Sequence, residues 1–77
     1  MNLFKLKDFT QGCLRYFYKP EGAGEWGEVA YDFQLNEAKI TTRASSSSPS
    51  HDRHALSKIK ECAEKSYFDR EFVQAWV

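Results

Sequence analysis

Three runs of alternating side chains between Cys13 and Ala44 constrain the fold of this chain more than any other part of its sequence. Within each run, apolar and polar positions alternate, as they do in strands with one buried and one solvated face. The positions of the buried face are Leu14, Tyr16 and Tyr18, then Val29, Tyr31, Phe33 and Leu35, then Ala38, Ile40, Thr42 and Ala44. Strands are expected at residues 12–19, 26–35 and 38–44, separated by turn residues. The pattern predicts a three-stranded antiparallel β-meander over residues 12–44.

The polar face of this predicted sheet carries its charges in rows. The outer strands contribute Arg15, Lys19, Lys39 and Arg43, and the middle strand contributes Glu28 and Asp32. Opposite charges on neighbouring strands contribute roughly 0.2–1 kcal/mol per pair. We therefore expect the basic residues of this face to find acidic partners within the sheet.

After a Ser-rich connector at residues 45–50, the period of the apolar residues changes to that of a helix. Ser48 fits the N-cap position, and Pro49 fits the first helical position. Apolar residues then recur at spacings of three and four, at Ala55, Leu56, Ile59, Cys62, Ala63 and Tyr67. This pattern predicts an amphipathic helix whose apolar stripe covers the buried face of the sheet. The predicted fold class is α+β.

The two ends of the chain are less regular. Residues 1–11 fit either a fourth, edge strand or an N-terminal arm that docks on the rest of the chain. Beyond the helical stripe, the apolar row shifts by one residue, to Phe68, Phe72 and Trp76. The shift favours a helix that ends near Ser66 and a short helical tail that restarts with Asp69 as a second cap, rather than one helix with a second apolar face turned outward. One small α+β domain is thus predicted over residues 1–77, with helix and helical tail at 49–77.

The length and the charge of the chain exclude several classes of protein. A chain of 77 residues with 11 basic and 11 acidic side chains is too short for a multi-domain enzyme or a long repeat array. Its zero net charge argues against a protein that binds DNA mainly by neutralising phosphates. No apolar run reaches the length of a membrane span, and the N-terminus lacks the apolar stretch of a secretory signal. Cys13 and Cys62, far apart in sequence, are then expected to be reduced in a cytoplasmic protein.

One short motif matches a phosphate-binding loop. Residues 22–29, GAGEWGEV, fit GxGxxGxV and resemble the glycine-rich loop with which protein kinases cover phosphates. The resemblance ends with these eight residues, because no HRD, DFG or APE motif follows. Residues 21–37 also contain five acidic side chains and no basic one, a charge that repels phosphate. We therefore interpret the glycines as hairpin residues, which adopt backbone conformations that other residues avoid.

The residue types that most often carry catalysis or bind metals do not form a set in this sequence. His51 and His54 lie about one helical turn apart, but Cys62 follows His54 by eight positions, which is about 12 Å along a helix. One metal ion cannot span that distance. The predicted fold places no histidine beside Cys13, and no nucleophile, base and orienting group can be assembled. We therefore expect no catalytic residue, no cofactor and no metal site.

Surplus aromatic side chains are the remaining signal. Five of them fall outside the two predicted apolar faces: Phe17, Trp26, Phe68, Phe72 and Trp76. Either the two chain ends fold back and cover them, or they contact another protein, because aromatic residues are enriched at interface centres. The sequence therefore predicts a small non-enzymatic protein-interaction or adaptor module, which binds another protein or a second copy of itself as a homodimer.

Single-stranded nucleic-acid binding is the alternative interpretation. Phe17 lies between Arg15 and Lys19 on the polar face of the predicted sheet, an arrangement typical of platforms on which bases stack. Glu28 and Asp32 in the middle strand oppose phosphates, however, and the chain lacks the net basic charge that marks most nucleic-acid-binding proteins. Protein contact is therefore the favoured function.

Overall fold

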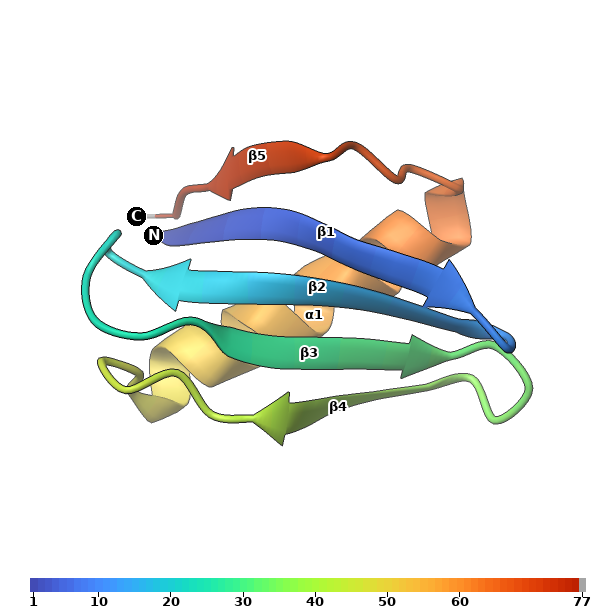
Figure 1. The fold of residues 1–77 in the computed structure, drawn as a ribbon, viewed down its shortest axis with the longest axis horizontal. Helices are drawn as coiled ribbons and strands as arrows, with labels where there is room; N and C mark the ends of the chain where they lie inside the picture. The colour runs from blue at the N-terminus through green and yellow to red at the C-terminus, as the bar shows by residue number, and fades with distance from the viewer. Residues whose placement is uncertain (77) are drawn as a thin grey trace.

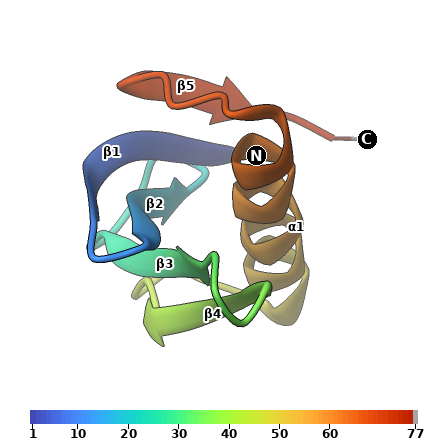
Figure 2. The same cartoon turned by 90° about the vertical axis from the view of Figure 1, so that its right-hand side faces the viewer.

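The computed structural model describes residues 1–76 and contains one five-stranded antiparallel sheet and one helix. In chain order the elements are β1 (Asn2–Thr10), β2 (Cys13–Pro20), β3 (Gly27–Asp32), β4 (Glu37–Thr42), α1 (Pro49–Lys65) and β5 (Glu71–Gln74). The strands lie in the order β4-β3-β2-β1-β5. α1 runs diagonally behind this sheet in Figure 1, and Figure 2 shows the resulting two layers. The α+β class predicted from the sequence is confirmed.

The predicted meander is present as β2, β3 and β4, which pair antiparallel in sequence order. Tyr16 pairs with Val29, and Val29 pairs in turn with Ile40. These side chains belong to the core or pack against it. The alternation of the sequence therefore predicted the buried face of these three strands, except near the end of β4. A register shift there places Thr42, expected on the buried face, opposite Glu28, and Thr42 is exposed.

The end of β3 differs from the predicted strand at 26–35. β3 ends at Asp32, whose carboxylate accepts hydrogen bonds from the backbone N–H groups of Gln34 and Leu35 at 2.9 and 3.1 Å. A carboxylate that binds its own following backbone folds a turn. Leu35, expected on the buried face, is 63% exposed as a result.

The N-terminal residues form a strand rather than a docking arm. β1 pairs with β2 on one side and with β5 on the other, so it is an inner strand and not the predicted edge strand. Its pairing with β2 shifts register between Leu6 and Asp8, which leaves Lys7 as the extra residue of a β-bulge. The sheet is therefore wider than the predicted three or four strands.

The predicted helical tail is wrong, because residues 71–74 form β5, antiparallel to β1. The spacing of four between Phe68, Phe72 and Trp76 fits a helix, but it is also twice the strand period of two. As a strand, this segment pairs with β1 and places the ring of Phe72 against that of Phe4 in the core. Val77, the last residue of the predicted tail, lies outside the described residues.

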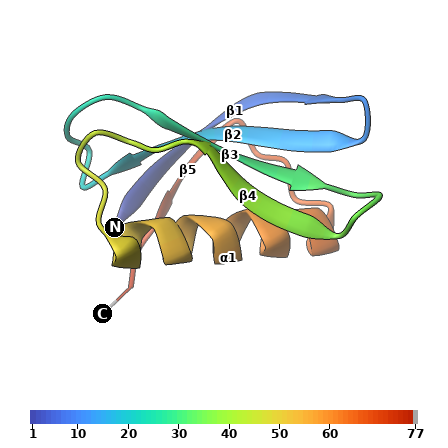
Figure 3. The same ribbon diagram turned by 90° about the horizontal axis from the view of Figure 1, so that it is seen from below.

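α1 has the predicted N-terminus and the predicted apolar stripe as far as Ala63. Tyr67, the last residue of the predicted stripe, lies beyond the end of α1 and is 43% exposed. Ser48 is the N-cap, its side chain accepts a hydrogen bond from the N–H of His51, and Pro49 opens the helix. The helix ends at Lys65, where Ser66 adopts a left-handed conformation with φ 53°. The buried residues of α1 are Ala55, Ile59, Cys62 and Ala63. α1 lies flat against one side of the sheet (Figure 3), and this apolar layer is the core of the molecule.

Candidate functional site

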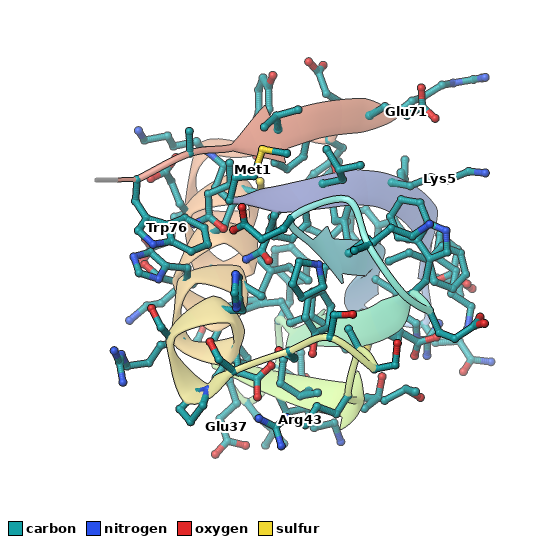
Figure 4. All side chains as sticks on the ribbon, turned by 90° about the vertical axis from the view of Figure 1, so that its left-hand side faces the viewer. Met1, Lys5, Glu37, Arg43, Glu71 and Trp76 are labelled. Atoms are coloured by element: carbon teal, nitrogen blue, oxygen red, sulfur yellow. The ribbon has the colours of Figure 1, made fainter. Side chains whose placement is uncertain are left out.

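α1 covers one face of the sheet and leaves the other uncovered (Figure 2). We call the uncovered side the open face; its side chains include Leu3, Lys5, Lys7, Arg15, Phe17, Lys19, Glu28, Glu71 and Val73. Their neighbours along each strand point toward α1, because successive side chains of a strand alternate between faces; the exception is the bulge at Lys7, after which Asp8 also lies on the open face opposite Arg15. In Figure 4, Lys5 and Glu71 point away from α1, whereas Trp76 lies on the side of α1. The open face is therefore the side of the sheet that is accessible to other molecules.

The charges of the open face are paired differently from the prediction. Arg15 donates to Asp8 at 2.8 Å, and Lys7 donates to Glu28. The predicted ion pairs between β2 and β3 do not form within residues 1–76. The reason is that β1 brings Asp8 opposite Arg15, whereas β3 places Ala30 there. The hydrogen bond from Lys7 is the main cause that lowers the pKa of Glu28, so this carboxylate stays charged on the open face.

Two of the five predicted contact residues lie together on the open face. The rings of Phe17 and Trp26 meet edge to face, with centroids 6.4 Å apart. The ammonium group of Lys19 lies 4.7 Å from the centroid of Trp26, and that of Lys7 lies 5.6 Å from the centroid of Phe17. Trp26 remains 37% exposed. The structure thus joins Phe17, Trp26 and the basic side chains beside them into one surface.

The other three predicted contact residues, from the C-terminal segment, pack within the molecule. Each of their rings meets another ring: Phe72 stacks on Phe4 at 4.9 Å between centroids, Phe68 meets Phe9 edge-on at 5.1 Å, and Trp76 stacks on His54 at 3.8 Å. These contacts correspond to the interpretation in which the chain ends fold back and cover their own aromatic side chains. We therefore base the site on Phe17 and Trp26.

Sequence reasoning missed a groove between β1 and β5. A cavity of about 410 Å³ is lined by Leu3, Phe4, Trp26, Glu71, Phe72 and Val73. A second hollow of about 500 Å³ shares Glu71 with it and is lined by Lys5, Leu6, Lys7, Arg70 and Glu71. We call the two together the β1–β5 groove. In the sequence, the alternation from Glu71 to Gln74 indicates the strand that forms one wall of this groove. Four alternating residues are a weaker pattern than the helical spacing of Phe68, Phe72 and Trp76.

The two histidines are engaged by their neighbours at the start of α1. His51 contacts the hydroxyl of Ser48 through Nδ1 at 2.7 Å and the carboxylate of Glu21 through Nε2 at 3.0 Å. The Nδ1 atom of His54 lies 2.8 Å from the carbonyl oxygen of Ser50. Within residues 1–76, no three His, Cys, Asp or Glu side chains are arranged to hold a metal ion.

The glycine motif allows a loop to approach the Ser-rich connector closely. Gly24 has a φ of +78°, and a Cβ atom at this position would lie 2.5 Å from the hydroxyl of Ser45. The N–H of Glu25 donates to the same hydroxyl at 2.6 Å. Gly22 and Gly24, both with positive φ, therefore serve the connection between β2 and β3 through their backbone conformation.

No protein-family model, curated protein or solved structure matches the chain. Among the described residues 1–76, the helix α1 is not long and apolar enough to cross a membrane. The function is therefore inferred from the open face and the β1–β5 groove.

Proposed function

We propose that this chain is a small non-enzymatic protein-interaction or adaptor module that binds its partner through the open face. The observation that carries the proposal is the β1–β5 groove beside Trp26, on the side of the sheet that α1 leaves uncovered. Exposed apolar surface with a polar surround is typical of protein contact sites. Val73 and Trp26 are 56% and 37% exposed at this groove. Glu71 lines the same cavity, Lys19 lies over Trp26, and Lys5 lines the adjoining hollow.

Protein contact fits this face better than nucleic-acid binding. Arg15 and Lys7 are already paired with carboxylates, and Glu71 stands within the groove. Phe17, the central residue of the nucleic-acid alternative, meets Trp26 and carries the ammonium group of Lys7 over its ring. A base would have to displace these contacts before it stacked there.

A second copy of the chain is one partner that this proposal includes. Light scattering over a range of protein concentrations distinguishes a homodimer from a complex with another protein, because a homodimer doubles the mass in solution.

The proposed location of the protein is the cytoplasm, and its two free cysteines support this location.

Affinity capture from the cells that produce this protein tests the proposal. The wild type, Trp26→Ala and Lys60→Ala are immobilised and compared, since Lys60 is an exposed residue of α1, outside the open face. We expect one or a few proteins that wild type and Lys60→Ala retain and that Trp26→Ala binds about 30-fold more weakly, the loss of an interface residue that contributes about 2 kcal/mol. Equal capture by all three variants, with a monomeric mass in solution, would contradict the proposal.

A further inference from the structure

We infer that the β1–β5 groove takes an extended segment of a partner protein, which adds to β5 as a further strand and has an apolar side chain next to acidic residues. This inference rests on the proposed function and specifies the chemistry of the partner. It follows from three features of the same region: the free edge of β5, the apolar part of the groove and the unpaired cations at its other end.

The hydrogen bonds of β5 leave one of its edges free. The N–H of Leu6 donates to the carbonyl oxygen of Arg70 at 2.7 Å, so these two residues face each other as a bonded pair. Bonded pairs recur at every second residue of an antiparallel ladder, which places Phe72 in the next pair with β1. The backbone groups of Glu71 and Val73 therefore point away from β1. Figure 1 shows β5 at the border of the sheet, where these groups are available to another strand.

The opposite edge of the sheet is less suited to strand addition. The register of β4 on β3 shifts between Glu28 and Val29, and such bulges are one means by which proteins keep edge strands from pairing. Thr41 also donates its hydroxyl to the backbone oxygen and to the carboxylate of Glu28, at 3.2 and 2.7 Å. β5 is therefore the edge at which we place the partner.

The apolar part of the groove defines one residue of the partner. Glu71 and Val73 pair with Lys5 and Leu3, so their side chains lie on the open face beside the cavity of about 410 Å³. A strand added to β5 has alternate side chains on this face. A long apolar side chain, such as Leu, Met or Phe, then reaches across Val73 toward Leu3 and Trp26.

The charges at the other end of the groove define the partner residues next to this apolar side chain. Lys5, Lys7 and Arg70 line the hollow of about 500 Å³, and Glu71 is the acidic residue among its lining side chains. Lys7 is paired with Glu28, but within residues 1–76 neither Lys5 nor Arg70 forms an ion pair. Carboxylates of the partner complement these two cations. A nucleic acid also offers negative charge, but it has no peptide backbone that could pair with the free edge of β5.

Two synthetic probes test this inference. One is a short acetylated and amidated peptide in which Leu alternates with Thr and Asp residues follow at one end; the other carries Lys in place of Asp. Binding is measured by fluorescence anisotropy and by NMR. We expect only the Asp peptide to bind, and we expect the amides of Glu71 and Val73 to shift and gain protection from hydrogen exchange while those of β4 do not.

Variants of Val73 and Arg70 separate the contribution of the free backbone edge from that of the charge. Val73→Pro removes an N–H that points away from β1, so it leaves the β1–β5 ladder intact but prevents pairing with the probe. Val73→Ala shortens the same side chain and keeps the N–H. We expect Val73→Pro to abolish binding and Val73→Ala to weaken it less. Arg70→Glu should lower affinity for the Asp peptide about tenfold or more and raise it for the Lys peptide, whereas Lys60→Glu should change neither. Thermal melting checks that each variant is folded.

Several results would overturn the inference. They are equal binding of the two peptides, binding that Val73→Pro does not affect, protection along β4 instead of β5, or binding of an oligothymidylate in place of the peptides. A homodimer that protects Glu71 and Val73 without any probe would assign the edge to a second copy. If the probes fail but Trp26→Ala still loses a captured protein, strand addition is wrong and the proposed function stands. If capture fails as well, both are wrong.

Discussion

At the scale of single residues, Asp52 joins three parts of the molecule. Its carboxylate accepts hydrogen bonds from the hydroxyl of Tyr18 at 3.0 Å, from Nε of Arg43 at 2.9 Å and from the hydroxyl of Ser47. Burial alone would raise the pKa of Asp52, but these hydrogen bonds and the charge of Arg43 outweigh it, and the pKa is lowered. The sheet, the connector and α1 therefore meet at one charged group. This also corrects the prediction for Arg43, whose partner lies on α1 and not within the sheet.

The lowered pKa of Asp52 predicts a specific loss of stability in acid. The unfolded chain has an Asp pKa of about 3.9, so the stabilisation by the carboxylate is complete above about pH 4 and is lost as the pH falls through the folded value. We expect Asp52→Asn to lower the free energy of unfolding by about 1–3 kcal/mol at pH 7 and by less at pH 3. Urea unfolding at the two pH values measures this. Glu64→Gln, at an exposed position of α1, is the control, and an equal effect of Asp52→Asn at both pH values would contradict the prediction.

At the scale of secondary-structure elements, β5 is the part that the sequence predicted as a helix. Its inward side chains are Phe72 and Gln74, and its outward ones are Glu71 and Val73. Phe72 stacks on Phe4, and Gln74 donates to the carbonyl oxygen of His54 at 2.8 Å. The alternation is that of a strand, and each inward residue has a partner from a distant part of the chain.

The alternation along β5 predicts different costs for two neighbouring substitutions. We expect Phe72→Ala to lower the free energy of unfolding by about 2–3 kcal/mol, less than the roughly 3–5 kcal/mol of a fully buried Phe, because Phe72 is only half-buried. Val73→Ala, on the exposed side of the same strand, should change it by no more than about 0.5 kcal/mol. Denaturant unfolding followed by circular dichroism gives both values. A larger cost for Val73→Ala than for Phe72→Ala would show that β5 is turned the other way.

At the scale of the whole molecule, the two ends of the chain complete one sheet around one core. β1 and β5 come from opposite ends of the sequence and pair over four residue pairs. Cys62 lies in the core, 1% exposed, whereas Cys13 is half-buried in β2. Burial raises the pKa of the Cys62 thiol, which disfavours the reactive thiolate. Access to Cys62 therefore requires the core to open.

Thiol labelling measures this opening directly. We expect a disulfide reagent to modify Cys13 quickly and Cys62 roughly 200- to 5,000-fold more slowly, the factor that corresponds to an unfolding free energy of about 3–5 kcal/mol for a small core. Urea should accelerate only the slow reaction. The variants Cys13→Ser and Cys62→Ser assign the two phases to their residues. Rapid modification of Cys62 without urea would mean that α1 detaches from the sheet without global unfolding.

The sequence by itself determined the meander and the helix. From Cys13 to Lys65, the alternation of period two and the recurrence of period 3.6 record which side of each element is buried, and the cap at Ser48 marks the start of α1. Phe17 and Trp26 were found in the same way, because apolar side chains on a polar face stand out against its pattern.

The tertiary structure decided what the chain ends become and where the groove lies. A spacing of four in Phe68, Phe72 and Trp76 satisfies a helix and a strand alike, so local pattern could not choose between them. Tertiary contacts decided for the strand: it pairs with β1, stacks Phe72 on Phe4 and brings Gln74 to the carbonyl oxygen of His54. The β1–β5 groove exists only once that pairing has formed, since its walls come from residues about 70 positions apart in the sequence.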